Sequence, residues 1–141
     1  MTHADILETL LVATNRLTRA SAQTTGSSVI SAAWTTLSML MTDGPHRNGE
    51  LARIARISQP GMTKVLHELI AQGWARRTAD LGDSRAWLID ITEDGRAALL
   101  AWRSELAATM MPSFADLGEE DWAALRRAAE IMSSRTAMVA A

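Results

Sequence analysis

The chain has 141 residues, 48% of them hydrophobic and 21% charged, which suits one domain with a hydrophobic core and is too short for two. It contains no cysteine, so disulfides, thiolate metal sites and thiol-based redox sensing are excluded. The N-terminus has no basic targeting segment, and no apolar run approaches the roughly 18 residues of a membrane span. We therefore expect a cytoplasmic protein that does not enter a membrane.

The charges are unevenly distributed along the chain. The formal net charge is -2, but residues 46–85 hold seven basic and four acidic side chains and so carry +3. The remaining residues therefore carry -5. A basic middle segment is the electrostatic footprint that a polyanion such as DNA selects.

Two amphipathic helices are predicted before the basic segment. The first has apolar residues at helical spacing from Ile6 to Leu17, and its pattern ends in the polar stretch "SAQTTGSS", which we expect to be a loop. The second runs from Ile30 to Met41 and is stopped by the "DGP" at residues 43–45.

A third, short helix is expected in "NGELARIA". Asn48 is a candidate N-cap, and Glu50 suits the positive end of the helix dipole. Leu51, Ile54 and Ala55 provide its buried face.

The stretch "ISQPGMTKVLHELIAQGWARR" predicts a fourth helix that ends at Gly73. Ser58 can cap its first turn, where Pro60 lacks an N–H that would have no partner. Its apolar stripe is formed by Met62, Val65, Leu66, Leu69 and Ile70. Its exposed face carries Gln59, Gly61, Thr63, Lys64 and His67. A short helix, a tight turn and a second helix with a polar face form the helix-turn-helix layout, whose second helix enters the DNA major groove.

A β-hairpin is predicted after Gly73, because the pattern becomes alternating. "WARRTA" and "WLIDIT" read as strands around the turn-rich "DLGDSRA", with Trp87, Ile89 and Ile91 on one face. A hairpin beside a helix-turn-helix is a wing. Thr92 can cap the next helix, and a last helix begins near Glu119. Because so small a winged core cannot bury the apolar faces of the terminal helices, we expect a homodimer.

These stretches together resemble the MarR family of transcription regulators over essentially the whole chain. The resemblance is carried by "AAWTTLSML", "GELA", "SQPGMTKVLHELIAQGWARR" and the wing from Asp83 to Leu100. The spacing of Asp83, Arg85, Ile91, Thr92 and Gly95 is its most specific part. Two positions depart from the family pattern: Arg56 stands where a glycine is frequent, and Trp74 where a leucine is usual. Arg56 either alters the turn or adds a phosphate contact.

The resemblance implies binding to double-stranded DNA. We expect phosphate contacts from Arg47, Ser58 and Arg76 or Arg77, and base contacts from Gln59, Thr63 and Lys64. His67 is either a DNA contact or solvated. Asp83 and Arg85 are either a surface ion pair or, as the resemblance implies, a carboxylate that orients an arginine toward the minor groove.

The resemblance also implies control by a small aromatic or anionic effector. Trp34, Met39 and Trp87 are the candidate ligand-binding residues. The alternative is that the tryptophans and methionines fill the core and interfaces and that the regulator is independent of any ligand.

An enzyme is the competing class of function. The "GDS" at residues 82–84 is similar to the nucleophile block of GDSL-type hydrolases, but these need a downstream Asp-x-x-His and no histidine follows His67. His3, His46 and His67 are too scattered for a metal site, and we predict no cofactor and no enzymatic activity. A purely helical protein-interaction module would explain the terminal helices but not the polar helix face and basic wing.

The expected fold is mainly α, an α+β winged helix-turn-helix with a two-stranded β wing and N- and C-terminal dimerisation helices. We expect a single domain over 1–141, with the DNA-binding part at 29–100 and the dimerisation helices at 1–22 and 101–141. The expected function is a repressor that binds an inverted-repeat operator as a homodimer.

Overall fold

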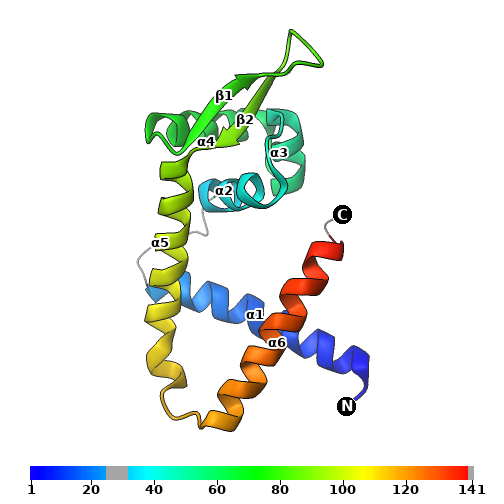
Figure 1. Ribbon diagram of the computed structural model, residues 1–141, viewed down its shortest axis with the longest axis vertical. Coiled ribbons are helices and arrows are strands. Elements are labelled where there is room, and N and C mark those ends of the chain that lie inside the picture. The colour runs from blue at the N-terminus through cyan, green and yellow to red at the C-terminus, as the bar shows by residue number, and fades with distance from the viewer. Residues whose placement is uncertain (25–31, 140–141) are drawn as a thin grey trace. The chain divides into compact units, whose positions relative to one another are not determined.

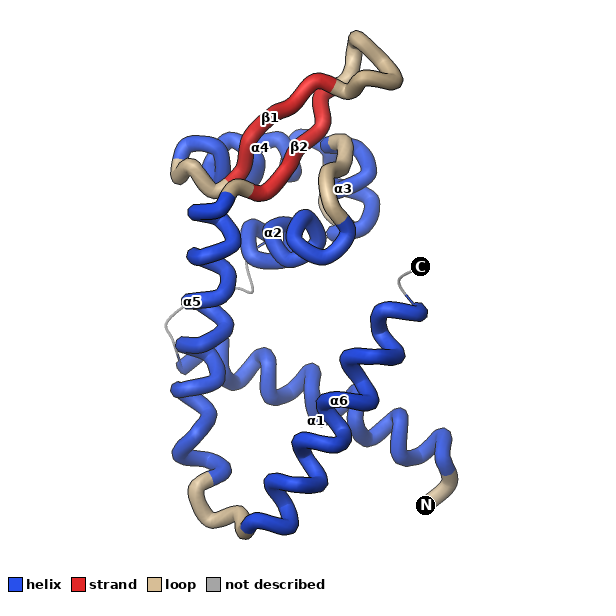
Figure 2. The backbone as a smooth tube through the Cα atoms, in the orientation of Figure 1, coloured by secondary structure: helices blue, strands red, loops and turns tan. Residues whose placement is uncertain are grey.

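The computed structural model describes residues 1–24 and 32–139. These residues contain six α-helices, one 3-10 helix and two β-strands, joined by loops (Figures 1 and 2). They are α1 (His3–Thr24), α2 (Ala32–Asp43), α3 (Asn48–Ala55), α4 (Gln59–Ala71), β1 (Ala75–Ala79), β2 (Trp87–Ile91), α5 (Glu93–Met110), η1 (Met111–Phe114) and α6 (Glu119–Val139). The chain divides into two units, Met1–Thr109 and Met110–Ala141. The expected mainly helical fold with a two-stranded wing is confirmed.

The core of the first unit lies where α2, α3 and α4 meet the hairpin. Its fully or almost fully buried apolar side chains are Leu37, Leu40, Leu51, Ala52, Met62, Leu66, Leu69, Ala75, Ile89, Ile91 and Leu99. Met62, Leu66 and Leu69 come from the apolar stripe that the spacing predicts for α4, and Val65 and Ile70 pack at its edge. Burying this stripe orients α4 and leaves its opposite face exposed.

The turn between α3 and α4 is tight because α3 ends in a left-handed residue. Arg56 has φ +56°, and the Ile57 N–H donates to the Ala52 carbonyl across the end of the helix. Arg56 therefore takes the backbone conformation that a glycine would take here. This conformation raises the free energy of any residue that has a Cβ atom.

The wing is an antiparallel hairpin in which Ala75 pairs with Ile91 and Ala79 with Trp87. Its loop, residues 80–86, extends beyond the helices (Figure 2). A single bridge joins the hairpin to the segment before α3, because the backbones of His46 and Ile89 exchange two hydrogen bonds, of 2.8 and 3.0 Å. The wing is thus anchored to the reading helices along β2.

Both ends of the hairpin are fixed by helix caps. Gly73 ends α4 with φ +76°, and the Trp74 N–H donates to the Leu69 carbonyl, so the predicted glycine stop is confirmed. Thr92 caps α5 as predicted: its hydroxyl accepts from the Gly95 N–H at 3.0 Å and donates to the Gly73 carbonyl at 2.6 Å. One threonine therefore joins the end of α4, the end of β2 and the start of α5.

Three tryptophans stack where α5 meets the winged core. The ring centroid of Trp34 lies 5.3 Å from that of Trp74 and 4.9 Å from that of Trp102. Trp74 is thus partly buried and serves as a larger packing residue at the position where the family usually has leucine.

The second unit consists of η1 and α6. Phe114 of η1 lies against Trp122 of α6, with 6.2 Å between ring centroids. The helix begins at Glu119, as predicted, with three acidic residues in its first turn.

Two local predictions are wrong. Helix α1 continues through Thr24, into the expected polar loop, because no glycine or proline interrupts it before Gly26, which lies outside the described residues together with Ile30. Asn48 is not a cap but the first residue of α3, and the cap position is held by Arg47. Trp87 shares one face of β2 with the buried Ile89 and Ile91, as predicted, and it is 59% exposed because it sits at the wing end of the strand, beyond the part that covers the core.

Candidate nucleic-acid interface

Helix α4 presents a row of polar side chains opposite its buried stripe. Gln59, Thr63 and His67 follow one another at intervals of four residues, and Lys64 lies beside them. Gln59, Lys64 and His67 are exposed and Thr63 is half-buried. The sequence-predicted face therefore exists, and it carries hydrogen-bonding groups of the kind that read base edges.

The start of α4 is tied to α3. The Asn48 amide donates to the Thr63 hydroxyl at 2.7 Å, and that hydroxyl donates to the Gln59 carbonyl at 3.0 Å. A Cβ on Gly49 would come within 2.8 Å of the Gln59 amide nitrogen, so the two helices approach closely. The hydroxyl of Thr63 is thus largely engaged within the protein, which leaves its methyl group and one lone pair for a ligand.

The cap of α4 matches its prediction. The Ser58 hydroxyl accepts from the Gly61 N–H at 3.0 Å, and a Cβ on Gly61 would press on this hydroxyl. Ser58 is exposed and keeps its own O–H as a donor. A phosphate placed here would meet the Ser58 hydroxyl at the positive end of the α4 dipole.

The two arginines of β1 point to different faces of the hairpin. Arg76 lies opposite Asp90 and approaches its carboxylate to 3.6 Å, as an exposed ion pair. Arg77 lies opposite Ile89 and is also exposed. Both side chains retain N–H donors beyond those contacts.

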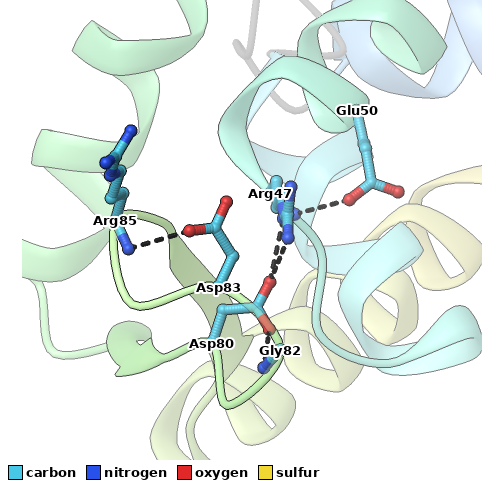
Figure 3. Close-up of polar contacts among 6 residues, drawn as sticks. All are labelled: Arg47, Glu50, Asp80, Gly82, Asp83 and Arg85. Atoms are coloured by element: carbon cyan, nitrogen blue, oxygen red, sulfur yellow. Dashed lines mark hydrogen bonds and ion pairs between the residues drawn. The ribbon is translucent and has the colours of Figure 1, made fainter.

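Arg47 lies at the start of α3 and reaches across to the wing (Figure 3). Its Nε and Nη2 atoms donate to one oxygen of Asp80, at 2.9 and 2.6 Å. Hydrogen bonds from the Arg47 guanidinium and from the Gly82 N–H hold the pKa of Asp80 below its ordinary value, and Asp80 raises the pKa of Arg47. The pair is therefore ionised at neutral pH.

Asp83 and Arg85 do not form a side-chain ion pair. The Asp83 carboxylate accepts from the backbone N–H of Arg85 at 3.0 Å, and the dashed line in Figure 3 ends on that nitrogen. Asp83 thereby shapes the turn that carries Arg85, as aspartates do in such loops. The guanidinium of Arg85 is exposed at the wing tip.

A cavity of about 350 Å³ lies between the wing and the reading helices. Trp87 lines it together with Arg47, Asn48, Thr63 and Arg77. Trp34 and Met39 are not among its lining residues, because Trp34 stacks with Trp74 and Trp102 and Met39 packs against the core. The structure thus separates the three residues that the sequence grouped as ligand-binding.

Two features of this region were not predicted from sequence: the contact of Asp80 with Arg47, and the contact of Asn48 with Thr63. Their partners lie 33 and 15 residues away, and no local pattern signals either contact. In the described part of the chain, no group of three or more His, Cys, Asp or Glu side chains could hold a metal ion. Among the described helices, none is long and apolar enough to cross a membrane.

The MarR family model matches residues 31–87, which run from the start of α2 to the start of β2. The members of this family are transcription regulators and not enzymes. The match therefore confirms the prediction that the chain is not an enzyme. A comparison with curated protein sequences finds no match.

Solved structures of similar fold cover most of the chain. Transcriptional regulator Tm0710 from Thermotoga maritima is 22% identical, with a TM-score of 0.68 over 93% of this chain and 91% of that one. Wild-type MarR from E. coli, in its apo form, is 16% identical, with a TM-score of 0.61 over 94% and 97%. BpsR from Bordetella bronchiseptica, whose DNA binding is regulated by 6-hydroxynicotinic acid, is 23% identical, with a TM-score of 0.57 over 89% and 91%.

These structural likenesses concern the fold, while the family match concerns the segment that contains both reading helices and the first strand of the wing. The fold, the polar face of α4 and the family match all lead to one class of protein. Residues 31–87 match the MarR family of transcription regulators, and the chain has the winged helix-turn-helix fold of the solved regulators named above.

Proposed function

We propose that this chain represses transcription by binding an inverted-repeat operator as a homodimer, with α4 in the major groove and the wing loop at the adjacent minor groove. The observation that carries the proposal is the exposed row of Gln59, Lys64 and His67 on a helix whose other face is fixed in the core. Such a helix can enter a groove without rearranging the domain.

The proposed contacts divide into those that position and those that read. Arg47, Ser58, Arg76 and Arg77 supply phosphate contacts, and Gln59 and Lys64 read base edges. Thr63 contributes its methyl group and holds Gln59 in place, while Gly61 and His67 border the same face. Asp83 shapes the loop from which Arg85 reaches the minor groove.

Dimerisation is proposed for the terminal helices, residues 1–22 and 101–141, with residues 29–100 as the DNA-binding part. Exposed apolar side chains on α1 include Leu7 and Leu11, and those on α6 include Leu125 and Ile131. Exposed apolar faces of this extent mark interaction surfaces in cytoplasmic proteins. A second copy of the chain is the partner that two-fold regulators require.

A small aromatic acid is the proposed effector class. The cavity beside Trp87 offers an exposed indole and the guanidinium groups of Arg47 and Arg77, which suit an aromatic ring with a negative charge. BpsR, which shares the fold, responds to such an acid. A ligand in this cavity would sit between wing and reading helix, and it would weaken DNA binding if it preferred a wing position unsuited to DNA. A ligand-independent regulator is the alternative.

The test is to select DNA from the protein's own genome and to measure its affinity by fluorescence anisotropy, beside a shuffled sequence of equal length. The proposal predicts specific binding at least about 1,000-fold tighter at physiological salt. Equal affinity for both sequences contradicts it and favours the helical interaction module. Titrating aromatic acids into the complex, with tryptophan fluorescence recorded in parallel, separates the ligand-responsive from the ligand-independent regulator.

A further inference from the structure

The contact between Arg47 and Asp80 joins two parts of the DNA-binding surface that are 33 residues apart in sequence. Arg47 precedes α3, and its own backbone N–H donates to the Glu50 carboxylate at 3.1 Å, which fixes it to the first turn of that helix. Asp80 follows β1 directly and is the first residue of the wing loop. The pair is therefore a connection between the reading helices and the wing.

Asp80 also organises the loop that follows it. Its Oδ2 atom accepts both hydrogen bonds from Arg47, while its Oδ1 atom accepts from the Gly82 N–H at 2.9 Å. Its backbone N–H donates to the Ala86 carbonyl, and its carbonyl accepts from the Asp83 N–H. Four groups of one residue thus hold both the base and the curvature of the loop that carries Arg85, and Figure 3 shows the two of them that belong to the side chain.

The two side chains of the ion pair differ in their exposure to solvent. The side chain of Asp80 is only 15% exposed, whereas that of Arg47 is 46% exposed. Two of the five guanidinium N–H bonds point to Asp80, and the other three remain for an outside acceptor. Arg47 can therefore be held by Asp80 and still donate to a phosphate, in an orientation fixed before DNA arrives.

We propose that Asp80 is a positioning residue for DNA binding, which fixes the wing loop and the Arg47 guanidinium relative to α3 and α4. This inference rests on the proposed function. Asp80 touches no DNA in this account and acts through Arg47 and the loop. Its carboxylate strengthens operator binding although its negative charge repels phosphates.

The opposing signs of these two effects make the proposal testable. Removing a carboxylate from a DNA-binding surface strengthens binding if only long-range electrostatics counts. Removing a positioning residue weakens specific binding, because the competent arrangement is then populated only part of the time and the apparent affinity falls by that fraction. If the freed wing is competent about one-tenth of the time, operator affinity falls about tenfold.

The experiment compares Asp80→Asn with Glu68→Gln in the full-length protein. Both substitutions remove one negative charge and keep the size of the side chain. Glu68 is exposed on α4, and the described residues show no ion pair to it. Each variant is titrated with the selected operator and with shuffled DNA at several salt concentrations, and unfolding by urea is followed by tryptophan fluorescence to verify that it folds.

We expect Asp80→Asn to bind the operator about tenfold more weakly and shuffled DNA as well as wild type or better. Glu68→Gln should bind both at least as well as wild type. Asp80→Glu, which keeps the charge, should recover part of the loss. The effect should be smaller in an Arg47→Ala background, because removing Asp80 then releases only the wing loop.

Operator affinity of Asp80→Asn equal to or above that of wild type overturns the proposal. If Asp80→Asn does not fold, the operator affinities of Asp80→Glu and of the single variant Arg47→Ala are measured instead. Wild-type operator affinity in both of these variants contradicts the proposal equally. Failure of the wild-type protein to distinguish operator from shuffled DNA is a different result, since it refutes the proposed function itself.

Discussion

Arg56 is the one residue other than glycine with a positive φ among the residues that the structure describes. The left-handed conformation brings Cβ close to the following carbonyl, which costs roughly 1–2 kcal/mol in a residue with a side chain. The turn between the reading helices keeps its shape despite this cost. Arg56 thus adopts the left-handed conformation that a glycine at this position would favour.

Replacing Arg56 with glycine should stabilise the protein. Relief of the backbone strain exceeds the extra entropy that glycine adds to the unfolded chain, so the free energy of unfolding should rise by roughly 0.5–1 kcal/mol. Urea denaturation measures this. Gly73→Ala is the matched control, because Gly73 also has a positive φ and open space around it, and it should destabilise. A stability loss in Arg56→Gly would show that the side chain makes a contact worth more than the strain.

Arg85→Ala should weaken binding to operator and shuffled DNA by similar factors. Its guanidinium is exposed at the wing tip and is not paired with Asp83, so its main contribution is a cation near the backbone and minor groove. The slope of the logarithm of affinity against the logarithm of salt concentration should become shallower by about one, because about one fewer counterion is released on binding. A loss confined to the operator would instead assign a reading role to Arg85.

At the scale of elements, the junction of β2 and α5 is the most tightly constrained part of the fold. A Cβ on Gly95 would lie 2.1 Å from the Trp74 carbonyl oxygen and 2.9 Å from Ile91 Cγ1. The same carbonyl accepts a hydrogen bond from the Thr92 N–H. The glycine is therefore required for the close approach of helix and backbone, rather than for its conformational freedom.

Gly95→Ala should thus destabilise the protein by about 3 kcal/mol, the cost of severe overpacking. Helix propensity alone predicts the opposite, a gain of about 1 kcal/mol. Ala97→Gly in the same helix is the control, since Ala97 is exposed and should lose only about 1 kcal/mol. Thermal unfolding monitored by circular dichroism decides between the two signs, and a stabilised Gly95→Ala variant would contradict the packing argument.

Elements built on local signals could be predicted from sequence, and contacts between distant residues could not. The Ser58 cap, the apolar stripe and the Gly73 stop all lie within α4, and each was predicted correctly. The stacking of Trp34 on Trp74 and Trp102 and the ion pair of Arg47 with Asp80 join residues far apart in the chain. Such contacts follow from tertiary packing, so no local pattern could predict the tryptophan stack or the ion pair that anchors the wing.

An inverted-repeat operator requires two copies of the chain, one for each half-site. Leu125→Glu places a charge on an exposed apolar position of α6, where a dimer would have to bury it. Sedimentation equilibrium should give twice the 15.3 kDa chain mass for wild type and a lower average mass for the variant. Ser134→Glu, also exposed on α6 but on the face opposite Leu125, is the control and should remain dimeric. A wild-type protein that is monomeric and binds its operator tightly would refute the assembly.

If α4 reads base sequence, Lys64→Ala should change which base pairs the protein prefers. Its affinity should be measured on a panel of operators that differ from the selected one by single base pairs, beside wild type. We expect Lys64→Ala to lose about 1–3 kcal/mol on the selected operator and its preference at one base pair in each half-site, with the other preferences kept. A uniform loss of affinity with an unchanged pattern of preferences would mean that Lys64 binds phosphate and that the sequence is read elsewhere.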